Sequence, residues 1–185
     1  MSSESYVISP PSPPSLPVAD TSKRFPVRRV WCVGRNYVEH IREMGQYERE
    51  PPFFFAKPSD ALVPDGATIP YPSLTKDFHF EVELVVALKS GGKNIAADKA
   101  LACVYGYGVG IDLTRRDLQI ASRDLKRPWE IGKFFDNSAP ASALRPASEI
   151  GHPSKGAIRL SVNYRRHGRP QRAECWGGSG GKEGR

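Results

Sequence analysis

The chain has 185 residues, 39% of them hydrophobic, so it can bury one core and is expected to form one domain with loose ends. Its formal net charge is +7, and +4 of this comes from the segment after residue 164, where six lysines and arginines stand against two glutamates. The rest of the chain is only mildly basic, which argues against nucleic-acid binding and is compatible with a small anionic substrate.

Membrane insertion and a disulfide framework are not expected either. No apolar run is long enough to span a bilayer, and the N-terminus lacks the basic-then-apolar pattern of a signal peptide. Cys32, Cys103 and Cys175 are far apart and lack C-x-x-C spacing, which excludes disulfides as the organising device. This cysteine usage favours a reducing, cytoplasmic location.

The chain begins with a segment rich in serine and proline, residues 1–24, which is expected to be extended and to pack weakly. Residues 27–33 are apolar and are predicted to form the first core strand. A short helix is predicted over residues 37–44, where His40 and Glu43 are i,i+3 neighbours. This pair is either an ordinary surface ion pair or a dyad in which the carboxylate fixes the imidazole tautomer, so that the histidine can take a proton from water.

A buried strand is predicted over residues 51–59, where Lys57 either faces a site or lies along the surface. The next predicted strand, residues 77–88, alternates in polarity. Its histidine and its two glutamates, Glu81 and Glu83, share one face, and an apolar row on the other face is expected to pack on a core. The acidic face is either a solvated surface or part of a site.

Residues 104–112 form a third predicted strand, and one of its faces carries three glycines and then Asp112. Glycine weakens a strand unless something approaches its backbone closely. If this strand lies beside the acidic one, Asp112, Glu81 and Glu83 converge, and three unpaired carboxylates at one point require a cation.

The segment that follows Asp112 supplies cations. Residues 114–117 are similar to a capping box and predict a helix that runs to about residue 124, with Arg116 and Gln119 on one side. Lys133 lies in an apolar stretch, either with its stem along the surface or as a desolvated cation that serves an anion. A one-sided strand is predicted over residues 157–164.

Together these motifs resemble the fumarylacetoacetate hydrolase family, especially its short fumarylpyruvate hydrolases and acylpyruvases. The resemblance covers roughly residues 26–171 and rests on motifs in matching order and spacing: residues 32–37 with His40 and Glu43, Glu81-x-Glu83, residues 112–119, and Lys133 with Asp136. It implies an α+β fold, a mixed β-roll, and a homodimer. It assigns the site as follows: a divalent metal on Glu81, Glu83 and Asp112; a water-activating dyad of His40 and Glu43; and substrate contacts from Arg116, Gln119 and Lys133.

The residue chemistry agrees with these assignments. Carboxylate ligands suit Mg²⁺ or Mn²⁺, whereas zinc is disfavoured because no second histidine or thiol stands near the cluster. A 2,4-diketo acid chelates such an ion, His40 would activate the attacking water, and Lys133 would help to hold the expelled enolate. For fumarylpyruvate the products are fumarate and pyruvate, and no organic cofactor is needed.

The sequence departs from the family pattern in two places. Phe80 replaces the second of two histidines that often precede the first metal-binding glutamate, which is expected to matter little for metal binding. After Gln171 the Thr-Gly-Thr-Pro-type turn is missing, and the glycine-rich residues 172–185 are predicted to be disordered. Residues 25–171 are therefore expected to form an incomplete catalytic domain, truncated at its C-terminal end and leaving a sheet edge exposed.

Three hypotheses follow. The first is a metal-dependent hydrolase of acylpyruvates. The second keeps the site but changes the reaction to decarboxylation, isomerisation or hydration of a 2-oxo acid. The third is a truncated relative that binds a metal or a partner without turnover.

Overall fold

The computed structural model describes residues 5–34, 53–163 and 165–172. The predicted helix 37–44, with His40 and Glu43, lies outside the described residues, and so does most of the glycine-rich tail. In the part that is described, no helix has the length and apolar character needed to cross a membrane.

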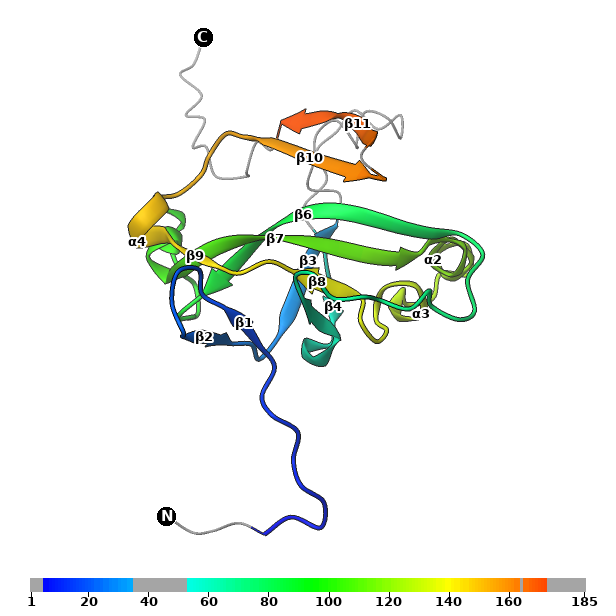
Figure 1. Cartoon of the computed structure of the whole chain (residues 1–185), viewed down its shortest axis with the longest axis horizontal. Coiled ribbons are helices and arrows are strands. Elements are labelled where there is room, and N and C mark those ends of the chain that lie inside the picture. The colour runs from blue at the N-terminus through cyan, green and yellow to red at the C-terminus, as the bar shows by residue number, and fades with distance from the viewer. Residues whose placement is uncertain (1–4, 35–52, 164, 173–185) are drawn as a thin grey trace.

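The centre of the molecule is a five-stranded mixed sheet (Figure 1). Its two long strands, β6 (Phe78–Leu88) and β7 (Val104–Arg115), pair in antiparallel fashion along their whole length. Beyond β7 lie β8 (Ala139–Ala141) and then β5 (Leu62–Pro64), which runs parallel to β8, and β9 (Arg145–Pro146) also pairs with β7. The predicted strands 77–88 and 104–112 are thus confirmed as neighbours.

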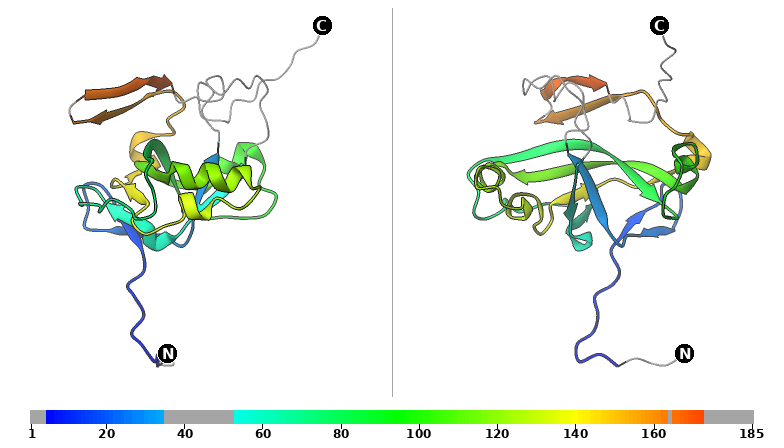
Figure 2. Two further views of the ribbon diagram at one scale, coloured as in Figure 1. Left: turned by 90° about the vertical axis from the view of Figure 1, so that its right-hand side faces the viewer. Right: turned by 180° about the vertical axis from the view of Figure 1, so that it is seen from behind.

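Three two-stranded units and a few short helices surround this sheet. The strand pairs are β1 (Ser15–Pro17) with β2 (Arg24–Pro26), β3 (Val30–Gly34) with β4 (Phe53–Lys57), and β10 (Ala157–Val162) with β11 (Arg165–Arg172). The helices are α2 (Arg116–Asp124), α3 (Glu130–Lys133), α4 (Ala147–Ile150) and the 3₁₀ turns η1 (Ser59–Ala61) and η2 (Ala97–Cys103). The β10–β11 hairpin lies on one side of the central sheet, and the β1–β2 and β3–β4 pairs lie on the other (Figure 2).

The small core joins the N-terminal segment to the central sheet. Leu16 of β1 packs with Ala87, Ala141 and Leu144, and each of these side chains is almost completely buried. The prediction that residues 1–24 pack weakly is therefore wrong for β1. Its single leucine fills a place in the core, which a local composition rich in serine and proline does not reveal.

The two faces of β6 differ from the prediction, because the face that carries the glutamates is also covered. The face that carries Glu81 continues through Val85 to Ala87, and these two residues pack in the core. On the other face, Phe80 and Val86 are 39% and 46% exposed. The expectation that this apolar row packs on a core is wrong at Phe80, whereas Phe78, Val82 and Leu84 are partly buried. β1 and β3–β4 cover the acidic face. Glu81 therefore lies on the covered face of the sheet, where its side chain is 30% exposed and pairs with cations.

The glycines of β7 do accommodate a close approach, and the approaching atoms belong to neighbouring strands of the same chain. A Cβ atom at Gly106 would overlap the carbonyl oxygen of Arg145 in β9. At Gly110 a Cβ atom would lie 2.8 Å from a side-chain carbon of Val85. The glycine face therefore lets the neighbouring strands close over β7 beside Asp112.

Candidate active site

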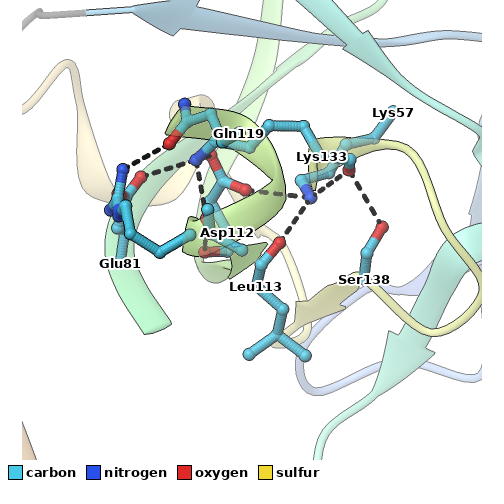
Figure 3. A network of polar contacts seen from close by, with 9 residues as sticks. Lys57, Glu81, Asp112, Leu113, Gln119, Lys133 and Ser138 are labelled. Atoms are coloured by element: carbon cyan, nitrogen blue, oxygen red, sulfur yellow. Dashed lines mark hydrogen bonds and ion pairs between the residues drawn. The ribbon is translucent and has the colours of Figure 1, made fainter. Parts of the chain in front are cut away.

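Glu81 and Asp112 face each other across β6 and β7. They are direct register partners, so their side chains project from the same face. The ammonium of Lys133 lies between them, with Nζ 2.8 Å from Glu81 Oε2 and 2.7 Å from Asp112 Oδ2 (Figure 3). Lys133 is only 2% exposed, so the interpretation of this lysine as a desolvated cation serving an anion is confirmed.

Thr114 completes the surroundings of Lys133, and sequence reasoning missed it. Its hydroxyl oxygen lies 2.7 Å from Lys133 Nζ, and its own proton is directed at the Asp112 carbonyl, 3.2 Å away. The prediction that Thr114 caps a helix is wrong, because β7 runs on to Arg115 and helix α2 begins without a side-chain cap. The signal that could have identified it is the period of the strand, since Thr114 stands two residues after Asp112 and therefore on the same face.

Lys57 lies behind Asp112 and is 3% exposed. Its Nζ atom donates to the carbonyl oxygens of Lys133, at 2.6 Å, and Leu113, at 3.0 Å (Figure 3). It also lies 2.9 Å from Asp112 Oδ1. The sequence left open whether Lys57 faces the site, and the structure shows that it does. Lys57 thus links β4 to β7 and to the C-terminal end of α3.

Arg116 and Gln119 lie on the same side of α2, as predicted. An Arg116 nitrogen lies 2.5 Å from Gln119 Oε1, and another forms an ion pair with Glu81 Oε1. Glu81 therefore holds Arg116 through one oxygen and Lys133 through the other. A planar guanidinium has five N–H donors, so these two contacts leave donors for a carboxylate ligand.

The position of Lys133 depends on the close packing of two short helices. α2 and α3 lie side by side (Figure 2). Gly132 permits this contact, because a Cβ atom there would lie 2.8–2.9 Å from Cβ, Cα and N of Gln119. The residue that follows in the chain is Lys133, so the glycine sets how deeply the ammonium enters the site.

The charges of the site shift the pKa values of its groups. Burial alone would raise the pKa of Glu81, but Lys133 and Arg116 outweigh it and hold the pKa below its usual range. Burial lowers the pKa of Lys57, and Asp112 opposes this effect. Burial, together with the negative charge of Asp112, raises the pKa of the Cys32 thiol to about 12. Glu81 is therefore an anion at neutral pH, whereas Cys32 is a neutral thiol.

Glu83 is the next acidic residue along β6. It shares the face of Glu81 but lies one pair farther along the strands, opposite Gly110. Within the described ranges, no three histidine, cysteine or acidic side chains gather closely enough to hold a metal ion. The roles of Glu83, His40 and Glu43 therefore stay predictions, the last two because they lie outside the described residues.

The residues present do fit a cation. The ammonium of Lys133 already stands where a positive charge meets Glu81, Asp112 and the Thr114 hydroxyl. Asp112 Oδ1 is buried and accepts no hydrogen bond within the described part of the chain, although Lys57 lies nearby. Carboxylate oxygens of this kind are the ligands that Mg²⁺ and Mn²⁺ prefer.

The loop before β6 is fastened to α2. Asp117 accepts a hydrogen bond from the Thr75 hydroxyl at 2.5 Å and from the Lys76 amide at 2.9 Å. The Arg116 amide donates to the Asp77 carbonyl at 2.8 Å. The bonds from the Lys76 amide and the Thr75 hydroxyl hold the pKa of Asp117 below its usual range. All three bonds keep the start of β6 beside the arginine that contacts Glu81.

Comparison with known proteins identifies the family. The family model for the fumarylacetoacetate (FAA) hydrolase C-terminal region matches residues 29–178. The chain belongs to the fumarylacetoacetate hydrolase family. The predicted α+β class with a mixed sheet is confirmed by the match to solved structures of this family.

Relatives in this family catalyse different reactions. The chain is 41% identical to the oxaloacetate tautomerase YcgM of Escherichia coli over 140 residues, which are 75% of this chain and 64% of that protein. It is also 41% identical to a fumarylpyruvate hydrolase of a Ralstonia species over 114 residues, which are 62% of this chain and 59% of that protein. The chain thus spans less than two thirds of the length of both relatives.

A solved structure adds information about ligands. The fumarylpyruvate hydrolase of Pseudomonas aeruginosa in complex with Mn²⁺ and pyruvate matches with a TM-score of 0.84 and 51% identity. The match covers 91% of this chain and 73% of that one. The fold of the fumarylacetoacetate hydrolase family is therefore present over nearly all of the chain.

Proposed function

We propose that the chain is a divalent-metal-dependent hydrolase that cleaves a carbon–carbon bond in a 2,4-diketo acid, with fumarylpyruvate as substrate and fumarate and pyruvate as products. The observation that carries this proposal is the pair of buried Asp112 and partly buried Glu81, with Lys133 between them and Arg116 at the rim. The similarity to a fumarylpyruvate hydrolase that binds Mn²⁺ and pyruvate supports it.

The metal would be Mg²⁺ or Mn²⁺, held by Glu81 and Asp112, with Glu83 as the third predicted ligand. When bound, it supplies Lewis-acid polarisation of the substrate oxygens. Asp112 suits this role because its two oxygens are fixed from behind by Lys57 and in front by Lys133. A carboxylate held in this way binds an ion without first losing side-chain freedom.

Arg116 and Lys133 would act on the substrate itself. We assign Arg116 to the substrate carboxylate, because a guanidinium can bind a carboxylate through two parallel hydrogen bonds and Gln119 and Glu81 fix its plane. Lys133 is assigned to the negative charge that develops on the 2-oxo acid fragment. A buried ammonium stabilises such a charge more than a solvated one does, because little water screens it.

Hydrolysis also requires an activated water, and we assign that task to His40 and Glu43. The histidine would take a proton from water, whose oxygen then attacks the distal carbonyl carbon. The carbon–carbon bond breaks, its electron pair passes to the 2-oxo acid fragment as an enolate, and protonation of that carbon yields pyruvate.

A second function deserves the same test, namely oxaloacetate tautomerisation. The specific observation in its favour is that the identity to an oxaloacetate tautomerase equals the identity to a fumarylpyruvate hydrolase. Both reactions pass through an enolate of a 2-oxo acid, so the same carboxylates, arginine and lysine suit either of them. They differ in the need for an activated water.

The deciding experiment is an ultraviolet assay of the purified chain with fumarylpyruvate and, separately, with the enol form of oxaloacetate, in the presence of Mn²⁺ or of a chelator. We expect metal-dependent cleavage of fumarylpyruvate that is lost in His40→Ala and in Glu81→Ala. Tautomerisation without cleavage would favour the second function. A soluble, folded chain that acts on neither substrate would refute both and leave a non-catalytic relative.

We also propose a homodimer in the cytoplasm. The outer face of β6 and β7 supports the dimer, since Phe80, Val86 and Val109 are substantially exposed there and an apolar sheet face favours a partner. Light scattering after size-exclusion chromatography tests the assembly, with a monomer as the contrary result. Cell fractionation tests the location.

A further inference from the structure

Lys133 has no hydrogen-bond donor left for a substrate. An ammonium has three N–H bonds, and Lys133 Nζ has three acceptors at 2.7–2.8 Å, namely Glu81 Oε2, Asp112 Oδ2 and Thr114 Oγ1. The side chain is 2% exposed, so solvent does not compete for these bonds. In this state Lys133 neutralises the carboxylates and cannot also donate to an incoming oxygen atom.

Two cations therefore compete for Glu81 and Asp112. One is the ammonium of Lys133, and the other is the divalent ion of the proposed function. A single positive charge less than 3 Å from both carboxylates repels a divalent ion that approaches the same oxygen atoms. The repulsion is strongest at Asp112, because Asp112 and Lys133 are almost completely buried and little water screens their charges. The two carboxylates therefore cannot bind both cations tightly at the same time.

We propose that Lys133 is a built-in counter-cation, which a divalent metal ion displaces from Glu81 and Asp112, and that this displacement frees the ammonium for the substrate. The inference rests on the proposed function, since it presumes that the same carboxylates bind the metal. It adds a second role for the metal, which releases the Lys133 ammonium for the substrate as well as polarising the substrate. It also implies an order of binding, with the metal first and the anionic substrate second.

The surroundings of Lys133 allow this change. Lys57 donates to the Lys133 carbonyl at 2.6 Å and so anchors the backbone of that residue independently of its side chain. Thr114 is not a carboxylate and can keep one bond to the ammonium when Glu81 and Asp112 turn to the metal. The side chain can therefore reorient while α3 stays in place.

The test is Mn²⁺ binding to the metal-free chain, measured by titration calorimetry for wild type, Lys133→Met and Lys99→Met. The last variant is the matched control, because Lys99 is exposed, lies on η2 and pairs only with Asp98 at 3.5 Å among the described residues. We expect the Kd for Mn²⁺ to fall about tenfold or more in Lys133→Met and to stay near the wild-type value in Lys99→Met.

Pyruvate binding provides the second readout. Wild type should bind pyruvate measurably tighter with Mn²⁺ than with chelator, because only the metal-bound state offers a free ammonium. Lys133→Met should bind Mn²⁺ more tightly and pyruvate more weakly than wild type. A lysine with a merely structural role would move both affinities in the same direction.

The outcomes separate this inference from the proposed function. Mn²⁺ binding by wild type that Lys133→Met leaves unchanged or weakens would overturn the inference alone. Absence of Mn²⁺ binding in both chains would overturn the metal dependence as well. If Lys133→Met fails to fold, a crystal of the wild type soaked with Mn²⁺ decides. Lys133 Nζ must then lie beyond hydrogen-bond distance, about 3.5 Å, from at least one of the two carboxylates, and unchanged bonds would overturn the inference.

Discussion

Gly132 offers a sharp test of how the fold delivers Lys133 to the site. A Cβ atom at this position would lie 2.8 Å from Cβ and 2.9 Å from Cα and N of Gln119. Ordinary contacts between carbon atoms begin near 3.5 Å, so Gly132→Ala must push α3 away from α2 by about 0.7 Å. The atoms met are mostly backbone, which cannot turn aside as a flexible side chain would.

Both stability and activity should respond to this shift. Overpacking costs about 1–3 kcal/mol, and the greater helix propensity of alanine returns up to about 1 kcal/mol, so we expect a net loss of about 1–2 kcal/mol in the free energy of unfolding. For a chain of this size, that lowers Tm by about 2–8 °C. Since a misplacement of 1 Å can reduce a rate by about 10²-fold, a shift of Lys133 by most of that distance should lower kcat/KM at least about tenfold.

The assay compares thermal unfolding and metal-dependent fumarylpyruvate cleavage in Gly132→Ala and Gly91→Ala. Gly91 is the matched control, because a Cβ atom there meets nothing within 4 Å. Gly91→Ala should unfold at the wild-type temperature. If Gly132→Ala is as stable and as active as this control, α3 is not held against α2 in the way that the structure indicates.

Three further predictions concern other parts of the site. Lys57→Met should lower the free energy of unfolding by about 3–5 kcal/mol in urea titrations, because Asp112 Oδ1 and two buried carbonyls lose the ammonium beside them; an unchanged transition would contradict this. Asp117 has a depressed pKa, so its stabilising contribution is present above about pH 4 and is lost as the pH falls through the folded-state value. Urea titrations between pH 7 and 3 should therefore show a smaller loss of stability on acidification in Asp117→Asn than in wild type, and equal losses would refute the reasoning. The Cys32 thiol, with a pKa of about 12, should react slowly with iodoacetamide at pH 8 in the native chain and rapidly after unfolding; peptide mass spectrometry measures this, and rapid native labelling would contradict it.

The sequence predicts those parts of the site that depend on the periodicity of a single strand or helix. The period of two along a strand places Glu81 and Asp112 on faces that can meet, and antiparallel pairing brings them together. The i,i+3 spacing on a helix places Arg116 beside Gln119. The alternation and the spacing need only the geometry of one strand or one helix, whereas the meeting of Glu81 and Asp112 also needs the register between β6 and β7.

Other features depend on contacts between distant segments, which the pattern does not contain. Alternation divides β6 into two faces but does not say which face is covered, and the covering residue Leu16 lies in a segment rich in proline. Lys57 precedes a proline turn and gives no local sign that it will reach Asp112. Thr114 sits where a strand and a predicted helix overlap, and the pairing of β6 with β7 extends the strand past it.

Under the proposed function, the composition of the described site suits two different reactions. Glu81, Asp112, Arg116 and Lys133 surround a place for negatively charged oxygen atoms, and an enolate of a 2-oxo acid needs such a place whether it arises by loss of a proton or by cleavage of a carbon–carbon bond. None of these four side chains is a neutral base that could activate water, because two are cations and the carboxylates are bound to them. The choice between hydrolysis and tautomerisation must therefore be made by groups added to this common centre. Under that proposal, the reaction depends on whether a base such as His40 is delivered to the bound substrate, and not on the residues that hold the enolate.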